Sequence, residues 1–107
     1  MNLFKETVEA LEKNGKTIND IVAIQCNDFR IDIDNFIEVA KATNYDKGYG
    51  SQEVACDLVI IGDGWWMERA EYDGAEWWKF KKAPVILNNV KQIDKLAGYG
   101  YCPLGKW

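Results

Sequence analysis

Residues 57–84 read DLVIIGDGWWMERAEYDGAEWWKFKKAP, and this stretch predicts the centre of the fold. Two Asp-Gly pairs, at positions 63–64 and 73–74, separate three apolar runs. A two-residue type I′ turn needs positive φ at both central residues, and Asp followed by Gly adopts those angles at low cost. The stretch therefore predicts three antiparallel strands, over residues 56–62, 65–72 and 75–82, joined by two tight hairpins.

Counting outward from the turns predicts which side chains share a face of this meander, because successive side chains of a strand point to opposite faces. The first face carries Leu58, Ile60, Met67, Trp78 and Phe80. The second face carries Val59, Ile61, Trp66, Ala70, Tyr72 and Trp77. We expect the first face to be buried, since charges interrupt its middle less. A single β-bulge would exchange the two faces beyond it.

Charged residues of the meander fall into cross-strand pairs in this register. Arg69 is placed to stack on Trp78, which is a cation–π arrangement. Glu68 faces Lys79 across the second face, so an ion pair is expected there. Glu71 faces Glu76, and like charges directly opposite each other destabilise a sheet. A basic group of a partner at that position would explain the pair.

The composition predicts one folded domain. The chain has 107 residues, of which 48% are hydrophobic and 28% charged, and such a balance argues against disorder. Aromatic residues reach 13%, and four of the five tryptophans lie within residues 57–84. Large aromatic side chains also supply core area to small domains, so the tryptophans alone do not indicate a binding site.

The net charge of −4 is unevenly distributed along the chain. Residues 53–76 contain seven acidic residues and one basic residue, whereas residues 77–107 contain six lysines and one acidic residue. Overall acidity argues against direct non-specific binding to nucleic acid, which requires a cationic surface. Solvated charges that meet across strands would produce the same pattern.

The inventory of reactive side chains predicts a protein that is not an enzyme and holds neither metal nor cofactor. Histidine is absent, and Cys26, Cys56 and Cys102 are too widely spaced for a CxxC motif. These facts remove the common zinc sets and the His-dependent nucleophile systems. Unpaired cysteines without a signal peptide indicate a cytoplasmic location. No apolar run approaches the ~20 residues of a membrane span.

The remaining chain predicts helices and a second hairpin, giving an α+β fold of one domain over residues 1–107. Apolar periodicity predicts a helix over residues 2–14, with Asn2 as N-cap and Gly15 at C′. Residues 21–26 and 29–33 form a short hairpin that extends the main sheet. Asp34 caps a second helix over residues 35–43, and a third helix runs from Asn88 or Asn89 to residue 97.

Two Gly-rich aromatic segments have open interpretations. In the loop over residues 44–52, Tyr45 and Tyr49 either contact a partner or fold back over the core. Residues 98–107, GYGYCPLGKW, either pack on the domain or form a mobile aromatic tail that orders on a partner.

The run WWMERAEYDGAEWWKFKKAP (65–84), preceded by YDKGYG (45–50), resembles a small family of phage and prophage proteins of Firmicutes. That family pairs a YDxGYG loop with an ExxEYDGxEWW hairpin, and the resemblance extends over most of the chain except the part after Pro84. The family brings no catalytic residue or cofactor. It implies a small accessory protein of a mobile element, acting in the host cell. Such proteins include inhibitors of host defence, anti-CRISPR proteins among them, as well as morphogenesis and regulatory factors.

These observations lead to the hypothesis of a non-enzymatic inhibitor that binds a protein partner. Aromatic anchors rimmed by charge are typical of protein interfaces. Acidic side chains would meet the basic channel of a nucleic-acid-binding effector. The residues predicted to bind the partner are Trp66, Glu68, Glu71, Tyr72, Asp73, Glu76 and Trp77, with Tyr45 and Tyr49 as loop contacts.

Three alternatives use the same part of the chain. The protein could be a structural or regulatory phage protein that forms a homodimer through the second sheet face. It could be a carbohydrate-binding module in which Trp66 and Trp77 form a stacking platform. A glycosidase-like carboxylate pair is the third alternative, but one short hairpin provides no deep cleft for it.

Overall fold

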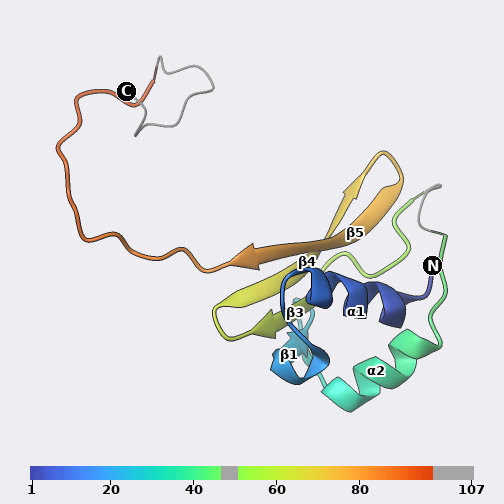
Figure 1. Ribbon diagram of the computed structural model, residues 1–107. Helices are drawn as coiled ribbons and strands as arrows, with labels where there is room; N and C mark the ends of the chain where they lie inside the picture. The colour runs from blue at the N-terminus through green and yellow to red at the C-terminus, as the bar shows by residue number, and fades with distance from the viewer. Residues whose placement is uncertain (47–50, 98–107) are drawn as a thin grey trace.

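The computed structural model describes residues 1–46 and 51–97 (Figure 1). In chain order the elements are α1 (Leu3–Lys13), a 3₁₀ turn η1 (Ile18–Asp20), β1 (Ile21–Gln25), β2 (Arg30–Ile31), α2 (Ile33–Lys41), β3 (Val59–Gly62), β4 (Trp65–Tyr72) and β5 (Ala75–Lys82). Within the described residues the strands form one antiparallel sheet in the order β2-β1-β3-β4-β5. The fold is therefore α+β.

The meander has the predicted register from Val59 onward, but β3 begins at Val59 and not at residue 56 as predicted. In β4 and β5, Trp66 faces Lys81 and Arg69 faces Trp78, and in β3 and β4, Ile60 faces Met67. The second turn has φ of 50° at Asp73 and 85° at Gly74, as a type I′ turn requires. The first turn differs from the prediction, because only Gly64 has positive φ there and Asp63 does not.

The sheet has five strands because the N-terminal hairpin pairs with the free edge of β3. Gln25 faces Val59 and Ile24 faces Ile60 across that junction, and β2 adds the outermost strand. The Asp57 carboxylate also accepts a hydrogen bond of 3.1 Å from the N–H of Asn27, which holds the hairpin turn. The three-stranded meander is thus the larger part of a wider sheet.

Both helices begin at side-chain caps. The Asn2 side chain accepts the N–H of Lys5 at 3.1 Å, and Gly15 has the positive φ of a C′ residue, as predicted. In α2 the predicted cap was wrong by two residues. Asp32 accepts the N–H of Asn35 at 3.2 Å, so the helix starts at Ile33 and Asp34 lies in its first turn.

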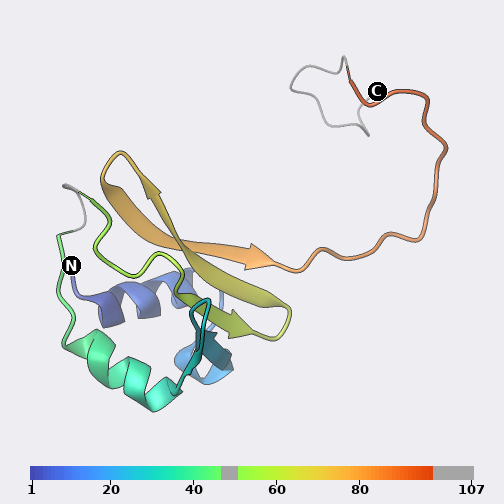
Figure 2. The ribbon, with the colours of Figure 1, turned by 180° about the vertical axis from the view of Figure 1, so that it is seen from behind.

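The two described helices lie on one side of the sheet, and the core lies between them and that face (Figures 1 and 2). Leu58, Ile60, Met67 and Trp78 are buried there, which confirms the predicted core face. Trp65 belongs to the same face and stacks on Phe80 at 5.4 Å between ring centroids. Its indole lies against Gly62, where an added Cβ would overlap the ring.

The predicted third helix is not formed. Residues 83–97 contain no helix and run outward from the end of β5 as an extended segment, coloured orange to red (Figures 1 and 2). A helix of about ten residues is marginal in water unless its apolar side packs against something. No such support reaches residues 88–97, where Val90 and Leu96 are exposed. The tail over residues 98–107 lies outside the described residues.

Candidate functional site

The second face of the meander is the first candidate site. We call its apolar residues the aromatic face: Val59, Ile61, Trp66, Ala70, Tyr72 and Trp77. Tyr72 is 77% exposed and Trp77 is 37% exposed, whereas Trp66 is half-buried between its neighbours. The described helices cover the opposite side of the sheet (Figure 2). The predicted anchors Trp66, Tyr72 and Trp77 therefore share the face that the described helices leave uncovered, with Tyr72 and Trp77 near the hairpin turn and Trp66 four residues along β4 from Ala70, which faces Trp77.

An ion pair crosses this face at a different position from the predicted one. Glu68 faces Lys79 in the register, but its carboxylate pairs diagonally with the ammonium of Lys81. The hydrogen bond from Lys81 is the main reason that the pKa of Glu68 lies below its usual range. Lys81 faces Trp66 directly, so the charged pair borders the aromatic anchor.

The predicted acidic rim is divided between the two faces. Glu71 and Asp73 are exposed at the β4–β5 turn. Glu76 is 1% exposed and points to the helix side, so its place on an exposed rim was wrong. The alternation of the strand explains this, because Glu76 has the same parity as Trp78, whereas Trp77 points the other way. The like-charge pair of Glu71 and Glu76 thus joins one solvated and one buried carboxylate.

Arg69 supplies the basic group that the buried glutamate requires. Its guanidinium lies 2.7 Å from Glu76 Oε1 and 2.9 Å from Glu6 Oε1, and all three side chains are buried. Glu76 also accepts the backbone N–H groups of Glu53 at 2.7 Å and Val54 at 3.2 Å. Arg69 stacks on Trp78 at 4.9 Å, as predicted. This network joins α1, the loop before β3 and the β4–β5 hairpin.

Tyr45 belongs to this buried network and is not an exposed loop contact. Its hydroxyl lies 2.7 Å from the Glu6 carboxylate oxygens and accepts a hydrogen bond from Arg69 at 3.2 Å. Burial, followed by the hydrogen bond to Glu6, raises the pKa of Tyr45 to about 12. Tyr49, the other predicted loop contact, lies outside the described residues. Of the two interpretations of the loop, Tyr45 follows the one that folds back over the core.

Glu6 is the member of the network that the sequence prediction missed. It lies on the buried side of α1, together with Leu3, Thr7 and Leu11. Spacings of three and four residues place these four positions on one helix face. An acidic residue within the apolar stripe of a helix was therefore the available signal that Glu6 is buried and paired.

The buried network of Arg69, Glu6 and Glu76 is expected to make the stability of the fold depend on pH in the acid range. Burial alone raises the pKa of Glu76, but the N–H of Glu53, the Arg69 guanidinium and the N–H of Val54 outweigh burial and lower it. A carboxyl whose folded pKa is below its unfolded value contributes stability above the unfolded pKa, and this is lost as pH falls through the folded pKa. We expect the urea midpoint to fall as the pH drops below the ordinary glutamate pKa of 4.5 and on through the lowered pKa of Glu76, and to fall less in Glu76→Gln. Equal acid dependence of Glu76→Gln and the wild type would contradict this; Glu71→Gln is the solvated control.

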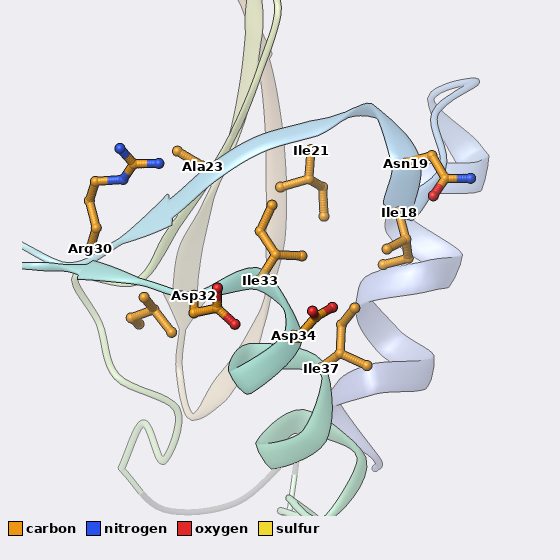
Figure 3. Close-up of a pocket in the computed structure, with 10 residues that line it drawn as sticks. Ile18, Asn19, Ile21, Ala23, Arg30, Asp32, Ile33, Asp34 and Ile37 are labelled. Carbon is orange, nitrogen blue, oxygen red and sulfur yellow. The ribbon is translucent and has the colours of Figure 1, made fainter.

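A concave region lies near the β2 edge of the sheet, away from the β4–β5 hairpin. It is a groove of about 720 Å³ between η1, β1, β2 and the start of α2 (Figure 3). We call it the isoleucine groove; it is lined by Ile18, Asn19, Ile21, Ala23, Arg30, Ile31, Asp32, Ile33, Asp34 and Ile37. Figure 3 shows isoleucine side chains converging on the space between β1 and the first turns of α2. Sequence analysis did not single out this groove.

A scan of protein-family models, a search of curated proteins and a search of solved structures found no match to this chain. Among residues 1–46 and 51–97, no group of three or more Cys, Asp or Glu side chains is arranged to hold a metal ion. Neither described helix has the length and apolar character needed to cross a bilayer.

Proposed function

We propose that this protein is a small non-enzymatic binding protein whose aromatic face engages a protein partner. The observation that supports this most directly is the separation of adjacent tryptophans. Trp78 is buried in the core, whereas Trp77, one residue earlier, is 37% exposed on the face that it shares with Trp66 and Tyr72. Core packing accounts for Trp65 and Trp78 but not for the three anchors of the aromatic face. Exposed clusters of Trp and Tyr are typical of interface centres.

Charge favours a basic partner. Residues 1–82 contain sixteen acidic and ten basic residues, a net charge of −6. Glu71 and Asp73 extend this acidity to the tip of the β4–β5 hairpin, beside Tyr72. The aromatic face itself carries Lys79 and Lys81 beside Glu68, so the acidic tip of the hairpin is the part that would enter a channel lined by Lys and Arg and compete there with nucleic-acid phosphates.

The partner class that we propose is a nucleic-acid-binding effector of host defence, encountered in the bacterial cytoplasm. The resemblance of the YDKGYG loop and the EYDGAEWW hairpin to phage and prophage proteins of Firmicutes supports this choice, because such accessory proteins include defence inhibitors. Inhibition would follow from occupation of the effector channel, without any catalytic step by this chain.

A binding experiment tests this proposal through the aromatic anchors. We expect Trp77→Ala and Trp66→Ala each to weaken binding to a purified guide-loaded CRISPR effector by at least about tenfold, because central aromatic anchors dominate interface energies. Biolayer interferometry on immobilised protein measures this effect. Val39→Ala, which truncates an exposed residue of α2, should bind like the wild type.

Circular dichroism of the same variants separates loss of contact from loss of fold. Folded Trp77→Ala that binds as tightly as the wild type would contradict the role of the aromatic face. Absence of binding by the wild type to basic effectors would contradict the partner class. Binding to polysaccharide instead would favour the carbohydrate-binding alternative, in which Trp66 and Trp77 stack on sugar rings.

A further inference from the structure

The segment after β5 exposes more apolar surface than any other described part of the chain. We call residues 83–97 the arm. Its aliphatic side chains are 50–93% exposed: Val85 84%, Ile86 90%, Leu87 77%, Val90 93%, Ile93 50% and Leu96 71%. Single exposed apolar residues are common, but six large ones within twelve positions form a patch of the kind that marks an interaction site. The arm therefore needs an apolar surface to cover it.

The isoleucine groove offers a surface of matching chemistry. Its floor consists of the buried Ile21 and the half-buried Ile18, Ile31, Ile33 and Ile37. Its volume of about 720 Å³ lies within the usual range of sites that enclose a ligand. The exposed carboxylates of Asp32 and Asp34 lie at its rim, together with Arg30 (Figure 3).

Charge is complementary between the two halves of the chain. Residues 1–82 have a net charge of −6, whereas the arm, with Lys91, Lys95 and Asp94, has a net charge of +1. Within the arm, Lys91 and Lys95 are interspersed with Val90, Ile93 and Leu96. An aliphatic segment that carries lysines is suited to an aliphatic groove with acidic side chains at its rim.

We propose that the arm of one copy docks in the isoleucine groove of a second copy, and that the two copies exchange arms reciprocally. The arm starts at β5, at the far side of the sheet from β2, and the bond from Ala83 N–H to the Gly64 carbonyl at 2.8 Å orients its first residue. From there it runs away from its own body (Figures 1 and 2). A fully extended arm of fifteen residues reaches about 50 Å, enough to cross to a neighbouring molecule.

The size of the contact suits a stable dimer. Each copy would contribute the fifteen residues of its arm and the ten residues of its groove, which matches the about 20–30 residues a side of a standard interface. Reciprocal exchange is two-fold and closed, so it ends at two copies. The aromatic face lies on a different part of the molecule and stays free to bind a partner.

Light scattering after size-exclusion chromatography tests this on the full chain. We expect a mass of twice the 12.3 kDa of one chain. The double variant Ile86→Asp/Val90→Asp should raise the dimer dissociation constant by at least about tenfold, since it places two charges in an apolar contact. Both positions are exposed in the structure, so this variant keeps a folded domain. Val39→Asp adds a charge at an exposed position of α2 and should remain dimeric.

Groove variants test where the arm docks. Ile37→Asp should also yield monomers, and Asp34→Lys should weaken the dimer without altering the packing of the core. A mixture of the arm variant and Ile37→Asp should recover a dimer of intermediate affinity, because the wild-type arm of the Ile37→Asp copy meets the wild-type groove of the arm-variant copy, and only the other contact pairs a variant arm with a variant groove. A mixture of the arm variant with wild type should retain one intact arm contact and give a dimer of intermediate affinity.

Three results would overturn the proposal. The first is a wild-type mass of 12.3 kDa at every concentration. The second is a dimer unaffected by the arm variant, and the third is one unaffected by both groove variants. Trp77→Ala is expected to leave the mass unchanged, so failure of arm exchange and failure of the proposed partner binding are distinguishable.

Discussion

Replacement of Arg69 by methionine is expected to lower the free energy of unfolding by about 3–5 kcal/mol, the range measured when one member of a buried charge network is removed. Glu6 and Glu76 both lie within 3 Å of the guanidinium, and their side chains are at most 6% exposed. Without Arg69, two carboxylates would remain in the core without their cation. A domain of this size has only about 5–15 kcal/mol of stability, so much of it would be lost.

Urea unfolding at pH 7, followed by tryptophan fluorescence, measures this effect. Arg30→Met is the matched control, because it removes the other arginine of the chain from an exposed site and should change stability by no more than about 0.5 kcal/mol. Arg69→Lys should fall between the two, since a lysine keeps the charge but cannot bridge both carboxylates with a planar fork.

Combining Arg69→Met with Glu6→Gln and Glu76→Gln should restore part of the loss. Neutral amides avoid the buried charge that the single variant leaves unpaired. The opposite result is a triple variant that is less stable than Arg69→Met by the summed effects of Glu6→Gln and Glu76→Gln measured alone. That result would show that the network contributes by its hydrogen bonds and not by its charge balance. An Arg69→Met protein as stable as Arg30→Met would contradict the structural role given to this network.

Trp78→Ala is expected to cost about 3–5 kcal/mol, whereas Trp77→Ala should cost less than about 1 kcal/mol. The two residues are neighbours in β5, so the substitutions have the same chemistry and differ only in the face they affect. Trp78 is 7% exposed, packs beside Arg69 and donates a hydrogen bond of 2.9 Å from Nε1 to Thr7 Oγ1. Its removal would leave a cavity under α1 and would remove the hydrogen bond that Thr7 Oγ1 accepts, although that hydroxyl would still donate to the Leu3 carbonyl at 2.7 Å.

Thermal and urea unfolding of the two variants, measured in parallel, decide this comparison. Trp78→Phe retains most of the ring and should lower the free energy of unfolding less than Trp78→Ala does. Its loss should come mainly from the missing hydrogen bond to Thr7. Equal destabilisation by Trp77→Ala and Trp78→Ala would contradict the separation of the two faces, and with it the argument that Trp77 is available to a partner.

The contrast between these tryptophans explains how a small domain could evolve a binding surface without losing its core. Changes at Trp66, Tyr72 or Trp77 alter the uncovered side of the sheet, whereas the side chains that alternate with them hold α1 and the loop before β3. Binding and folding are therefore expected to respond to different substitutions along the same two strands.

Local patterns were sufficient to predict much of this fold. The register of β3, β4 and β5, the buried face of the meander, the first helix with its Asn2 cap and the type I′ turn at Asp73 all follow from turn chemistry and from side-chain alternation. These features depend on residues close to one another in sequence. The cap of α2 was displaced because Asp32 and Asp34 are equally good caps, and only the entry from β2 selects the first.

The predictions that failed concern groups whose surroundings depend on side-chain choice and on how the elements pack together. The Glu68 ion pair shifted to Lys81 because two lysines were within reach of one carboxylate. The third helix depends on a surface to pack against, and residues 1–46 and 51–82 offer none that covers the exposed Val90 and Leu96. Glu76 and Tyr45 were assigned to an exposed site. Their neighbours in sequence do not reveal that Glu76 binds Arg69, and Tyr45 binds Glu6, in the core.

The sequence by itself determined the strands, the turns and the division of the meander into two faces, because backbone preference and alternation act over a few residues. The tertiary structure decided which charges are buried and which aromatic residues are left exposed. It also decided that the arm leaves the body. Those outcomes depend on which side of the sheet α1 and α2 cover, and that choice balances apolar burial against the cost of enclosing charge over the whole domain.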